Sequence, residues 1–358
     1  MTAFLFILGL VLLVAGAELL VRGASTLAAR LGLSPLMIGL TVVAFGTSSP
    51  ELAVSLKAAL GGSASVDLVL GNVVGSNILN VLVVLGLAAL ITPLVVTRLL
   101  VRVDVPIMIG VSILLVLLSL DGRIGRLDGL LLTLGMLAYS ALAYRLGKAD
   151  ERPEAAPLTP ADAHPPATSR GWLIPLLTTL TGLALLVLGS HWLVQGAMAL
   201  AQRLGISQMV IGLTVVAIGT SLPEIATAIM ATLRGQRDIA VGGVVGSNIA
   251  NILGVLGPSA VVAGGGIPVP AILFQLDYPL LLVAAAACLP VFFTEHTITR
   301  LEGVGLLVLY LIYTVLLVLH TIQHAAFGPS HRIFFLFVIP AMALPLLFQA
   351  WRQRGPSH

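Results

Sequence analysis

The chain has 358 residues, of which 58% are hydrophobic and only 9% are charged, and its mean hydropathy is +1.09. About a quarter of the residues of a soluble domain are charged, so this composition excludes a water-soluble globular protein and predicts a lipid bilayer as the environment. The net charge of +3 comes from scattered arginines without a dense basic patch, so we expect no nucleic-acid partner.

Apolar runs long enough to cross a bilayer, which takes about 20 residues, recur along the whole chain. They predict eleven transmembrane helices at 2–22, 36–60, 69–92, 104–120, 127–146, 172–200, 208–233, 239–263, 271–293, 302–322 and 333–351. The segment between the fifth and sixth helices holds five prolines and most of the charge that lies between spans, which is typical of a disordered linker.

These spans divide the chain into four parts. We predict a first five-helix repeat at 1–146, a disordered cytoplasmic linker at 147–170, a second repeat at 171–325, and an extra C-terminal helix with its tail at 326–358.

The distribution of basic residues predicts the orientation, because cytoplasmic loops carry an excess of lysine and arginine. With the N-terminus outside and the C-terminus inside, 13 of the 18 basic residues are cytoplasmic and 5 are external. Only two of these residues are lysines, a composition typical of GC-rich bacterial genomes. We therefore expect an integral protein of a bacterial inner membrane with a cytoplasmic C-terminus.

The two halves repeat each other. Residues 31–51 and 204–224 are identical at 15 of 21 positions, and 70–80 ("LGNVVGSNILN") matches 241–251 ("VGGVVGSNIAN"). Because each copy holds an odd number of spans, the second copy enters the membrane from the opposite side, as in transporters built from inverted repeats. The predicted fold class is an all-α polytopic membrane protein with inverted 5+5 repeats and an extra C-terminal helix.

The first repeated motif places a carboxylate inside an apolar span, as "AFGTSSPE" at 44–51 and "AIGTSLPE" at 217–224. Pro50 and Pro223 cannot donate a backbone hydrogen bond, so we expect each helix to loosen in the turn before its proline. Carbonyls freed in this way need partners inside a membrane, and a bound cation is one such partner.

The side chains of this motif are all hard oxygen donors. They are the hydroxyls of Thr47, Ser48, Thr220 and Ser221 and the carboxylates of Glu51 and Glu224. Ca²⁺ prefers about 6–8 such oxygens, and the absence of His and Cys from the motif argues against zinc or copper. An ionisable group within a span also indicates a functional site.

The second motif adds polar residues with helical spacing. Ser76 and Asn80 lie four residues apart, as do Ser247 and Asn251, so each pair shares one face of a helix and could add oxygens to the same cage. The alternative interpretations are that the serines bond their own backbone and that the asparagines only join helices.

Three further acidic residues fall outside the two motifs. Asp104 and Asp277 each precede a proline by two residues, which predicts capping carboxylates at helix starts. Glu18 is expected to pair with Arg22 one helical turn away, with a role in an ion vestibule as the alternative.

The doubled GTS-x-PE and GSN-x-x-N signatures resemble those of the sodium/calcium exchanger branch of the cation/calcium antiporter superfamily. The resemblance implies exchange of several Na⁺ for one Ca²⁺ by alternating access, with Ca²⁺ export as the usual direction and no cofactor other than the transported ions. Carried onto matching positions, the implied ligands are Ala44, Thr47, Ser48, Glu51, Ser76, Asn80, Ala217, Thr220, Ser221, Glu224, Ser247 and Asn251. Some relatives carry Asp in place of one or both asparagines, so Asn80 and Asn251 argue against potassium dependence.

Two other functions compete with this interpretation. The first is H⁺-coupled antiport of Ca²⁺ or another divalent cation, which normally has a different signature. The second is an intramembrane enzyme, which would need a nucleophile with its base or a metal with an open coordination position, and the repeated motifs contain neither. The sequence indicates no oligomeric state.

Overall fold

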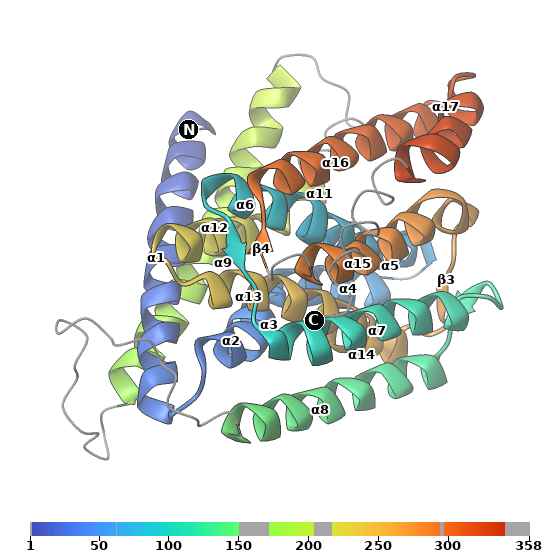
Figure 1. Cartoon of the computed structure of the whole chain (residues 1–358). Helices are drawn as coiled ribbons and strands as arrows, with labels where there is room; N and C mark the ends of the chain where they lie inside the picture. Colours follow the sequence, from blue (N-terminus) through green and yellow to red (C-terminus); the bar gives the residue numbers. More distant parts are fainter. Residues whose placement is uncertain (1, 62, 150–171, 204–216, 294–296, 341–358) are drawn as a thin grey trace.

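The computed structural model describes residues 2–61, 63–149, 172–203, 217–293 and 297–340, and the regular elements among them are helices apart from four two-residue strands (Figure 1). The elements of the first half are α1 (Thr2–Leu31), α2 (Pro35–Ile38), η1 (Gly39–Val43), α3 (Ala44–Thr47), α4 (Ser49–Leu60), α5 (Ser63–Leu79), η2 (Asn80–Val84), α6 (Leu85–Ile91), β1 (Leu94–Val95), η3 (Leu100–Asp104), α7 (Val105–Leu118), β2 (Arg123–Ile124) and α8 (Arg126–Ala149), where η marks a π-helical segment.

The second half repeats this order. Its elements are α9 (Leu173–Arg203), α11 (Ala217–Gly219), α12 (Leu222–Leu233), α13 (Arg237–Ala250), η5 (Asn251–Leu256), α14 (Gly257–Val262), β3 (Ile267–Pro268), η6 (Leu273–Asp277), α15 (Tyr278–Phe293), β4 (Thr297–Ile298) and α16 (Arg300–Thr321), followed by α17 (Phe327–Ile333) and η7 (Phe334–Val338).

The described helices agree with the predicted all-α polytopic fold. Seven helices are long and apolar enough to cross a membrane, one bent helix pair makes an eighth candidate, and Leu222–Leu233 and Leu273–Leu289 are shorter apolar helices. These ten correspond to the first ten predicted spans, although the first helix continues nine residues beyond its predicted end, to Leu31. Most of the predicted linker, and parts of the seventh and eleventh spans, lie outside the described residues.

The first helix of each half packs against the other along a line of glycines. Glycines recur every seven residues in α1, at 9, 16 and 23, and in α9, at 182, 189 and 196. A Cβ atom on Gly16 would lie 2.6 Å from the Leu186 nitrogen, and one on Gly182 would lie 2.4 Å from the Leu20 nitrogen. The two antiparallel backbones therefore touch, as small residues allow in membrane helices.

The remaining helices of the two halves interlock. Strand β1 pairs with β4 and β2 with β3, while α8 packs against α14 and α16 against α6. Each contact thus occurs twice with the halves exchanged, as expected for repeats related by a twofold axis. Figure 1 shows α16 and α8 along opposite edges of the molecule, with α5 and α13 between them.

The proline-containing helix of the first half breaks close to the predicted place. It is π-helical over Gly39–Val43, α-helical over Ala44–Thr47, and bent by 41° across Ser48. The predicted loosening of the turn at 44–47 is therefore wrong by a few residues. The reason is that the Ser49 hydroxyl donates to the Gly46 carbonyl at 2.5 Å, which replaces the bond that Pro50 cannot make.

Candidate functional site

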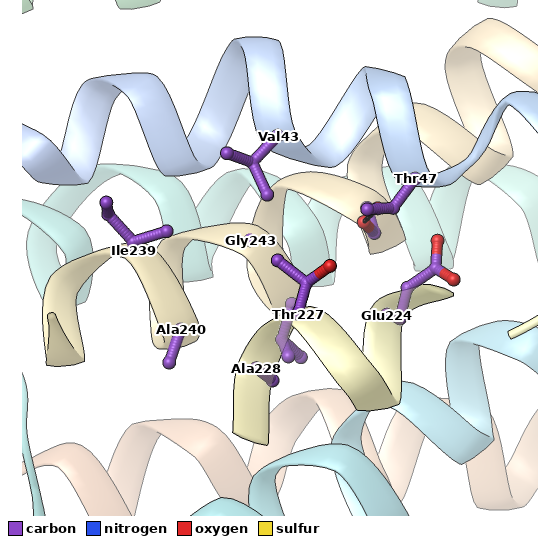
Figure 2. Close-up of a pocket in the computed structure, with 10 residues that line it drawn as sticks. Val43, Thr47, Glu224, Thr227, Ala228, Ile239, Ala240 and Gly243 are labelled. Carbon is purple, nitrogen blue, oxygen red and sulfur yellow. Dashed lines mark hydrogen bonds between the residues drawn. The ribbon is translucent and has the colours of Figure 1, made fainter. Parts of the chain in front are cut away.

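The two helix breaks hold the two intramembrane glutamates in the interior. Glu51 lies in the first turn of α4 with none of its surface exposed, and Glu224 lies in the first turn of α12 with 4% exposed. Figure 2 shows the Glu224 carboxylate next to Thr47, which comes from the opposite half. The structure thus brings one carboxylate from each repeat into a shared polar interior.

The Glu51 carboxylate contacts serines of both halves. Its Oε1 accepts hydrogen bonds from Ser221 at 3.2 Å and Ser76 at 3.5 Å, and these two hydroxyl oxygens lie 3.1 Å apart. Ser76 therefore does not serve only its own helix backbone, and a residue of the second repeat completes the environment of the first glutamate.

A second cluster forms around the Ala44 carbonyl. That oxygen accepts from the Thr47 hydroxyl at 3.3 Å and the Ser247 hydroxyl at 3.4 Å, and the two hydroxyls lie 3.4 Å apart. The equivalent threonine of the second half, Thr220, instead donates to the Asn72 amide oxygen at 3.3 Å. Ala217 opens the short helix α11 just before this second break.

Asn80 and Asn251 lie at equivalent places, each as the first residue of a π-helical segment and each fully buried. The Asn80 amide nitrogen donates to the Asn248 side chain at 3.1 Å, and the Asn251 nitrogen donates to the Asn77 side chain at 3.0 Å. Single π-helical turns are frequent at functional sites.

Several oxygens of this cage are buried without a hydrogen-bond partner. Within the described part of the chain they are Ser48 Oγ, Glu51 Oε2, both Oε atoms of Glu224, Asn80 Oδ1 and Asn251 Oδ1. The ion pairs found in that same part of the chain involve Glu18 and neither of these glutamates. Unpaired buried acceptors are costly, and hard oxygen atoms of this kind are the ligands that Ca²⁺ prefers.

A small pocket adjoins the Glu224 side of the cage (Figure 2). Its lining includes Thr47, Glu224, Thr227, Ala228, Gly243 and Ser247. The pocket therefore lies beside Glu224, and Gly243 forms part of its wall.

Some of the residues that shape the site were not identified from the sequence. Asn77 and Asn248 are hydrogen-bonded to each other's helices and so link the two halves. Both belong to the repeated GSN motif, and that repetition is the sequence signal that could have indicated them. Asn72 has no counterpart in the second repeat, where Gly243 occupies its place. A residue present in one copy alone gives no repeat signal.

The predicted capping role of Asp104 is wrong, because its side chain makes no capping hydrogen bond to α7. It accepts a hydrogen bond from Tyr139 at 3.1 Å, and the equivalent Asp277 accepts from Tyr313 at 2.7 Å. Each carboxylate therefore joins its helix to the last helix of the same half, α8 or α16.

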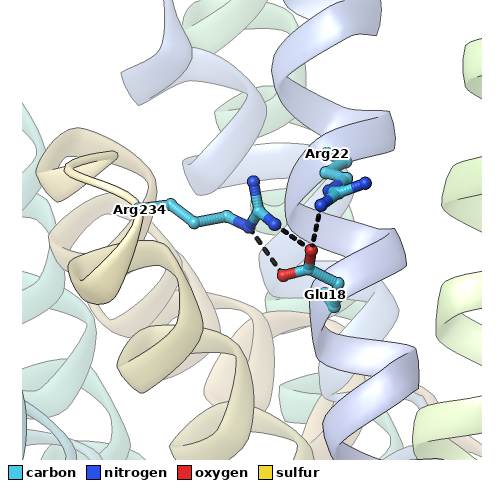
Figure 3. A network of polar contacts seen from close by, with 3 residues as sticks. All are labelled: Glu18, Arg22 and Arg234. Atoms are coloured by element: carbon cyan, nitrogen blue, oxygen red, sulfur yellow. Dashed lines mark hydrogen bonds and ion pairs between the residues drawn. The ribbon is translucent and has the colours of Figure 1, made fainter.

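Glu18 binds two arginines, one on its own helix and one at the end of α12 (Figure 3). Arg22, one turn along α1, approaches it at 2.6 Å, and Arg234 at the C-terminal end of α12 contacts both carboxylate oxygens. The expected pairing with Arg22 is present, and the bond to Arg234 additionally ties α1 to the helix that carries Glu224.

Comparison with known proteins agrees with this geometry. The family model described as "Sodium/calcium exchanger protein" matches residues 1–145 and 174–319. The putative antiporter CaxA of Alkalimonas amylolytica is 39% identical over 321 residues, which span 88% of this chain and 99% of the relative. The sodium/calcium exchanger MaX1 of Methanosarcina acetivorans is 31% identical over 342 residues, or 87% and 97% of the two chains.

The inner membrane protein YrbG of Escherichia coli is 38% identical over 283 residues, covering 78% of this chain and 85% of the relative. A solved structure of the sodium-calcium exchanger NCX_Mj, soaked with 10 mM Na⁺ and zero Ca²⁺, superposes with a TM-score of 0.74 at 30% identity and covers 87% of this chain and 97% of that chain. These similarities extend across both repeats and exclude the intramembrane-enzyme alternative.

Proposed function

Because the chain belongs to the sodium/calcium exchanger protein family, we propose that it is an antiporter that exchanges Na⁺ for Ca²⁺ and exports Ca²⁺ by alternating access. One observation carries the proposal: Glu51 and Glu224, one from each repeat, are buried together, and three of their four carboxylate oxygens lack a hydrogen-bond partner in the described chain. No cofactor other than the transported ions is part of this proposal.

The proposed ligands are oxygens from both repeats. They are the carbonyls of Ala44 and Ala217, the hydroxyls of Thr47, Ser48, Thr220, Ser221, Ser76 and Ser247, the amide oxygens of Asn80 and Asn251, and the carboxylates of Glu51 and Glu224. The two carboxylates would serve Ca²⁺, and subsets of the same oxygens would serve Na⁺. Their support is the clustering of these groups and the unpaired oxygens among them.

The charge of the site explains why transport would be an exchange. Two carboxylates held together away from water repel each other and lose their hydration, which is costly without a compensating charge. One Ca²⁺ or several Na⁺ remove that cost. The protein should therefore change its access side when loaded with either ion, and rarely when the site carries no cation.

The paired helices α1 and α9 are suited to be the moving part. Their backbones touch along the line of glycines, so the two helices would slide as one unit across the helix breaks. Alternate exposure of the cage then needs no unfolding of the helices that carry the ligands. A fluorescence-transfer pair on α1 and α9 should keep one distance in Na⁺ and in Ca²⁺, whereas a pair on α1 and α12 should change.

We further propose that the protein resides in a bacterial inner membrane with its N-terminus outside and its C-terminus in the cytoplasm. The asymmetry of 13 basic residues against 5 supports this orientation, and a relative carries the name inner membrane protein. Single-cysteine variants at Thr2 and near His358 in a Cys288→Ala background should react with an impermeant thiol reagent from opposite sides of intact cells.

The central experiment is ion flux in liposomes that contain the purified full-length protein. Radiolabelled Ca²⁺ should enter only when a Na⁺ gradient points outward, and Glu51→Gln should abolish this uptake. The matched control is Glu302→Gln, because Glu302 caps α16 at the surface and Gln performs the same capping role. Uptake driven by a pH gradient and insensitive to Na⁺ would replace this proposal with H⁺-coupled antiport.

A further inference from the structure

Four buried asparagine side chains form a closed set of hydrogen bonds between the two repeats. Asn77 and Asn80 lie at the junction of α5 and η2, and Asn248 and Asn251 lie at the junction of α13 and η5. None of the four side chains is more than 1% exposed. The proposed function uses the oxygens of Asn80 and Asn251 and assigns nothing to the other two.

Two backbone carbonyls fix which way the amides of Asn77 and Asn248 point. The Asn77 Nδ2 atom donates to the Asn248 backbone oxygen at 3.1 Å, and the Asn248 Nδ2 atom donates to the Asn77 backbone oxygen at 3.3 Å. A carbonyl can only accept a hydrogen bond, so each amide must turn its nitrogen toward the opposite helix. The Oδ1 atom of each amide is then directed elsewhere.

These two directed oxygens in turn determine the orientation of the other pair. The Oδ1 atom of Asn248 accepts from the Nδ2 atom of Asn80 at 3.1 Å, and the Oδ1 atom of Asn77 accepts from the Nδ2 atom of Asn251 at 3.0 Å. If the amide of Asn80 or of Asn251 were reversed, its oxygen would face the acceptor oxygen of Asn248 or of Asn77. Asn80 and Asn251 are consequently held with their oxygens turned away from this network.

The amide oxygens that are turned away from the network are the ones that lack hydrogen-bond partners. Asn80 Oδ1 and Asn251 Oδ1 are both buried and make no hydrogen bond within the described residues, although the nitrogens of the same amides are paired. A reversed amide would present two N–H groups to the cage, and N–H groups repel a cation. The orientation of these side chains therefore decides whether they can act as ligands.

We propose that Asn77 and Asn248 are positioning residues that fix the amide oxygens of Asn80 and Asn251 toward the transported cation. This inference rests on the proposed function and adds to it two residues that would set ion affinity without touching the ion. The arrangement occurs twice, with the repeats exchanged. Asn248 orients Asn80 of the first repeat, and Asn77 orients Asn251 of the second.

The test is a double-mutant cycle on Ca²⁺ binding to the purified full-length protein, measured by equilibrium dialysis. Asn248→Leu removes the acceptor that orients Asn80, and we expect the Kd for Ca²⁺ to rise about tenfold. Asn80→Ala removes the oriented oxygen itself. In the Asn80→Ala background, Asn248→Leu should then raise the Kd little further, because the two changes act on one ligand.

The control for packing is Met108→Leu, since the Met108 sulfur lies 3.5 Å from the same Asn248 nitrogen but orients no ligand. Its Kd should equal that of the unaltered protein. Asn77→Leu with Asn251→Ala provides the same cycle at the symmetry-related position if Asn248→Leu does not fold.

The outcomes separate the two proposals. If the unaltered protein binds no Ca²⁺, the proposed function fails and this role fails with it. If the unaltered protein binds Ca²⁺ but the effects of the two changes on the binding free energy add, or Asn248→Leu lowers the melting temperature without changing the Kd, then the exchanger proposal stands and the positioning role is overturned.

Discussion

Glu51 and Glu224 occupy equivalent positions in the two repeats, yet their surroundings differ. Beside Glu51, the Asn72 amide donates to Ser55 at 3.0 Å and to the Glu51 carbonyl at 3.2 Å, and it accepts from Thr220. Beside Glu224, the equivalent of Asn72 is Gly243 and the equivalent of Ser55 is Ala228, and both line the pocket. The first glutamate thus lies beside a hydrogen-bonded asparagine, whereas the second borders a small pocket.

The duplicated motif therefore contains the proposed ligands of both halves, whereas the residues around the motif differ between the halves. A site with twofold symmetry would be equally open to both sides of the membrane. Here the sequence itself removes that symmetry, because an asparagine in one copy is replaced by a glycine in the other. Exchanging residues between equivalent positions tests how much of the difference each residue carries.

The largest expected effect is on stability, at a pair of equivalent glycines. A Cβ atom on Gly246 would lie 2.5 Å from the Leu40 oxygen and 2.8 Å from the Ala44 Cβ, whereas one on Gly75 would meet nothing within 4 Å. Gly246→Ala should cost about 1–3 kcal/mol of unfolding free energy through overpacking, measured by thermal unfolding in detergent. Gly75→Ala is the control, and equal melting temperatures for the two variants would contradict the prediction.

The next effect is on transport, when Gly243 is replaced by the residue of the first half. Its Cβ would lie 3.7 Å from the Val43 side chain, so Gly243→Asn fits the backbone and places an amide in the pocket beside Glu224. We expect Na⁺-driven Ca²⁺ uptake to fall about tenfold, equivalent to ~1.4 kcal/mol, with little change in melting temperature. Gly243→Ala is the control that leaves most of the pocket open, and an unchanged rate in Gly243→Asn would show that ions do not use this pocket.

A smaller effect concerns the carbonyls freed by the two prolines. In the first half Ser49 bonds the Gly46 carbonyl, while in the second half position 222 is leucine and Ser190 of α9 bonds the Gly219 carbonyl at 2.7 Å. Ser190→Ala should lower the unfolding free energy by about 1 kcal/mol, because it leaves a buried acceptor unpaired.

Adding Leu222→Ser to Ser190→Ala would copy the local solution of the first half. The melting temperature of the double variant should return toward that of the unaltered protein. A double variant less stable than Ser190→Ala alone would mean that Leu222 matters more for packing than the carbonyl does for bonding.

The smallest effect is expected for the ion pairs of Glu18, whose equivalent in the second half is His191. Glu18 side-chain exposure is 26%, and its partners Arg22 and Arg234 are exposed by 60% and 33%. Exposed pairs contribute about 0.2–1 kcal/mol, so Glu18→Gln should lower the melting temperature slightly at low salt and less at high salt. His191→Gln should show no such salt dependence.

The sequence predicted the class of the molecule well because its main signals are periodic and repeated. The apolar runs predicted the first ten helices, although the first ends nine residues later than predicted, and the doubled motif indicated residues that the structure brings together, including Glu51, Ser76 and Ser221. Their role as ligands stays a prediction.

The two misses have different physical causes, and one of them is a partner that is distant in the sequence. Asp104 looked like a helix cap from its spacing to a proline, but Tyr139, 35 residues away, decides its hydrogen bonding. The turn at 44–47 stays α-helical, and the carbonyl of Gly46 that Pro50 leaves without a donor is bonded by the Ser49 hydroxyl instead. Local spacing alone does not specify such contacts.

The paired strands have a consequence for biosynthesis. Strand β2 finds its partner β3 only in the second half, and α8 likewise finds α14 there. When the first half leaves the translocon, β2 and α8 therefore still lack their partners, because the residues of the second half have not yet been translated. Insertion of the early helices therefore precedes completion of the fold, and a chain shortened by its last helices would leave α6 without the helix α16 that packs against it.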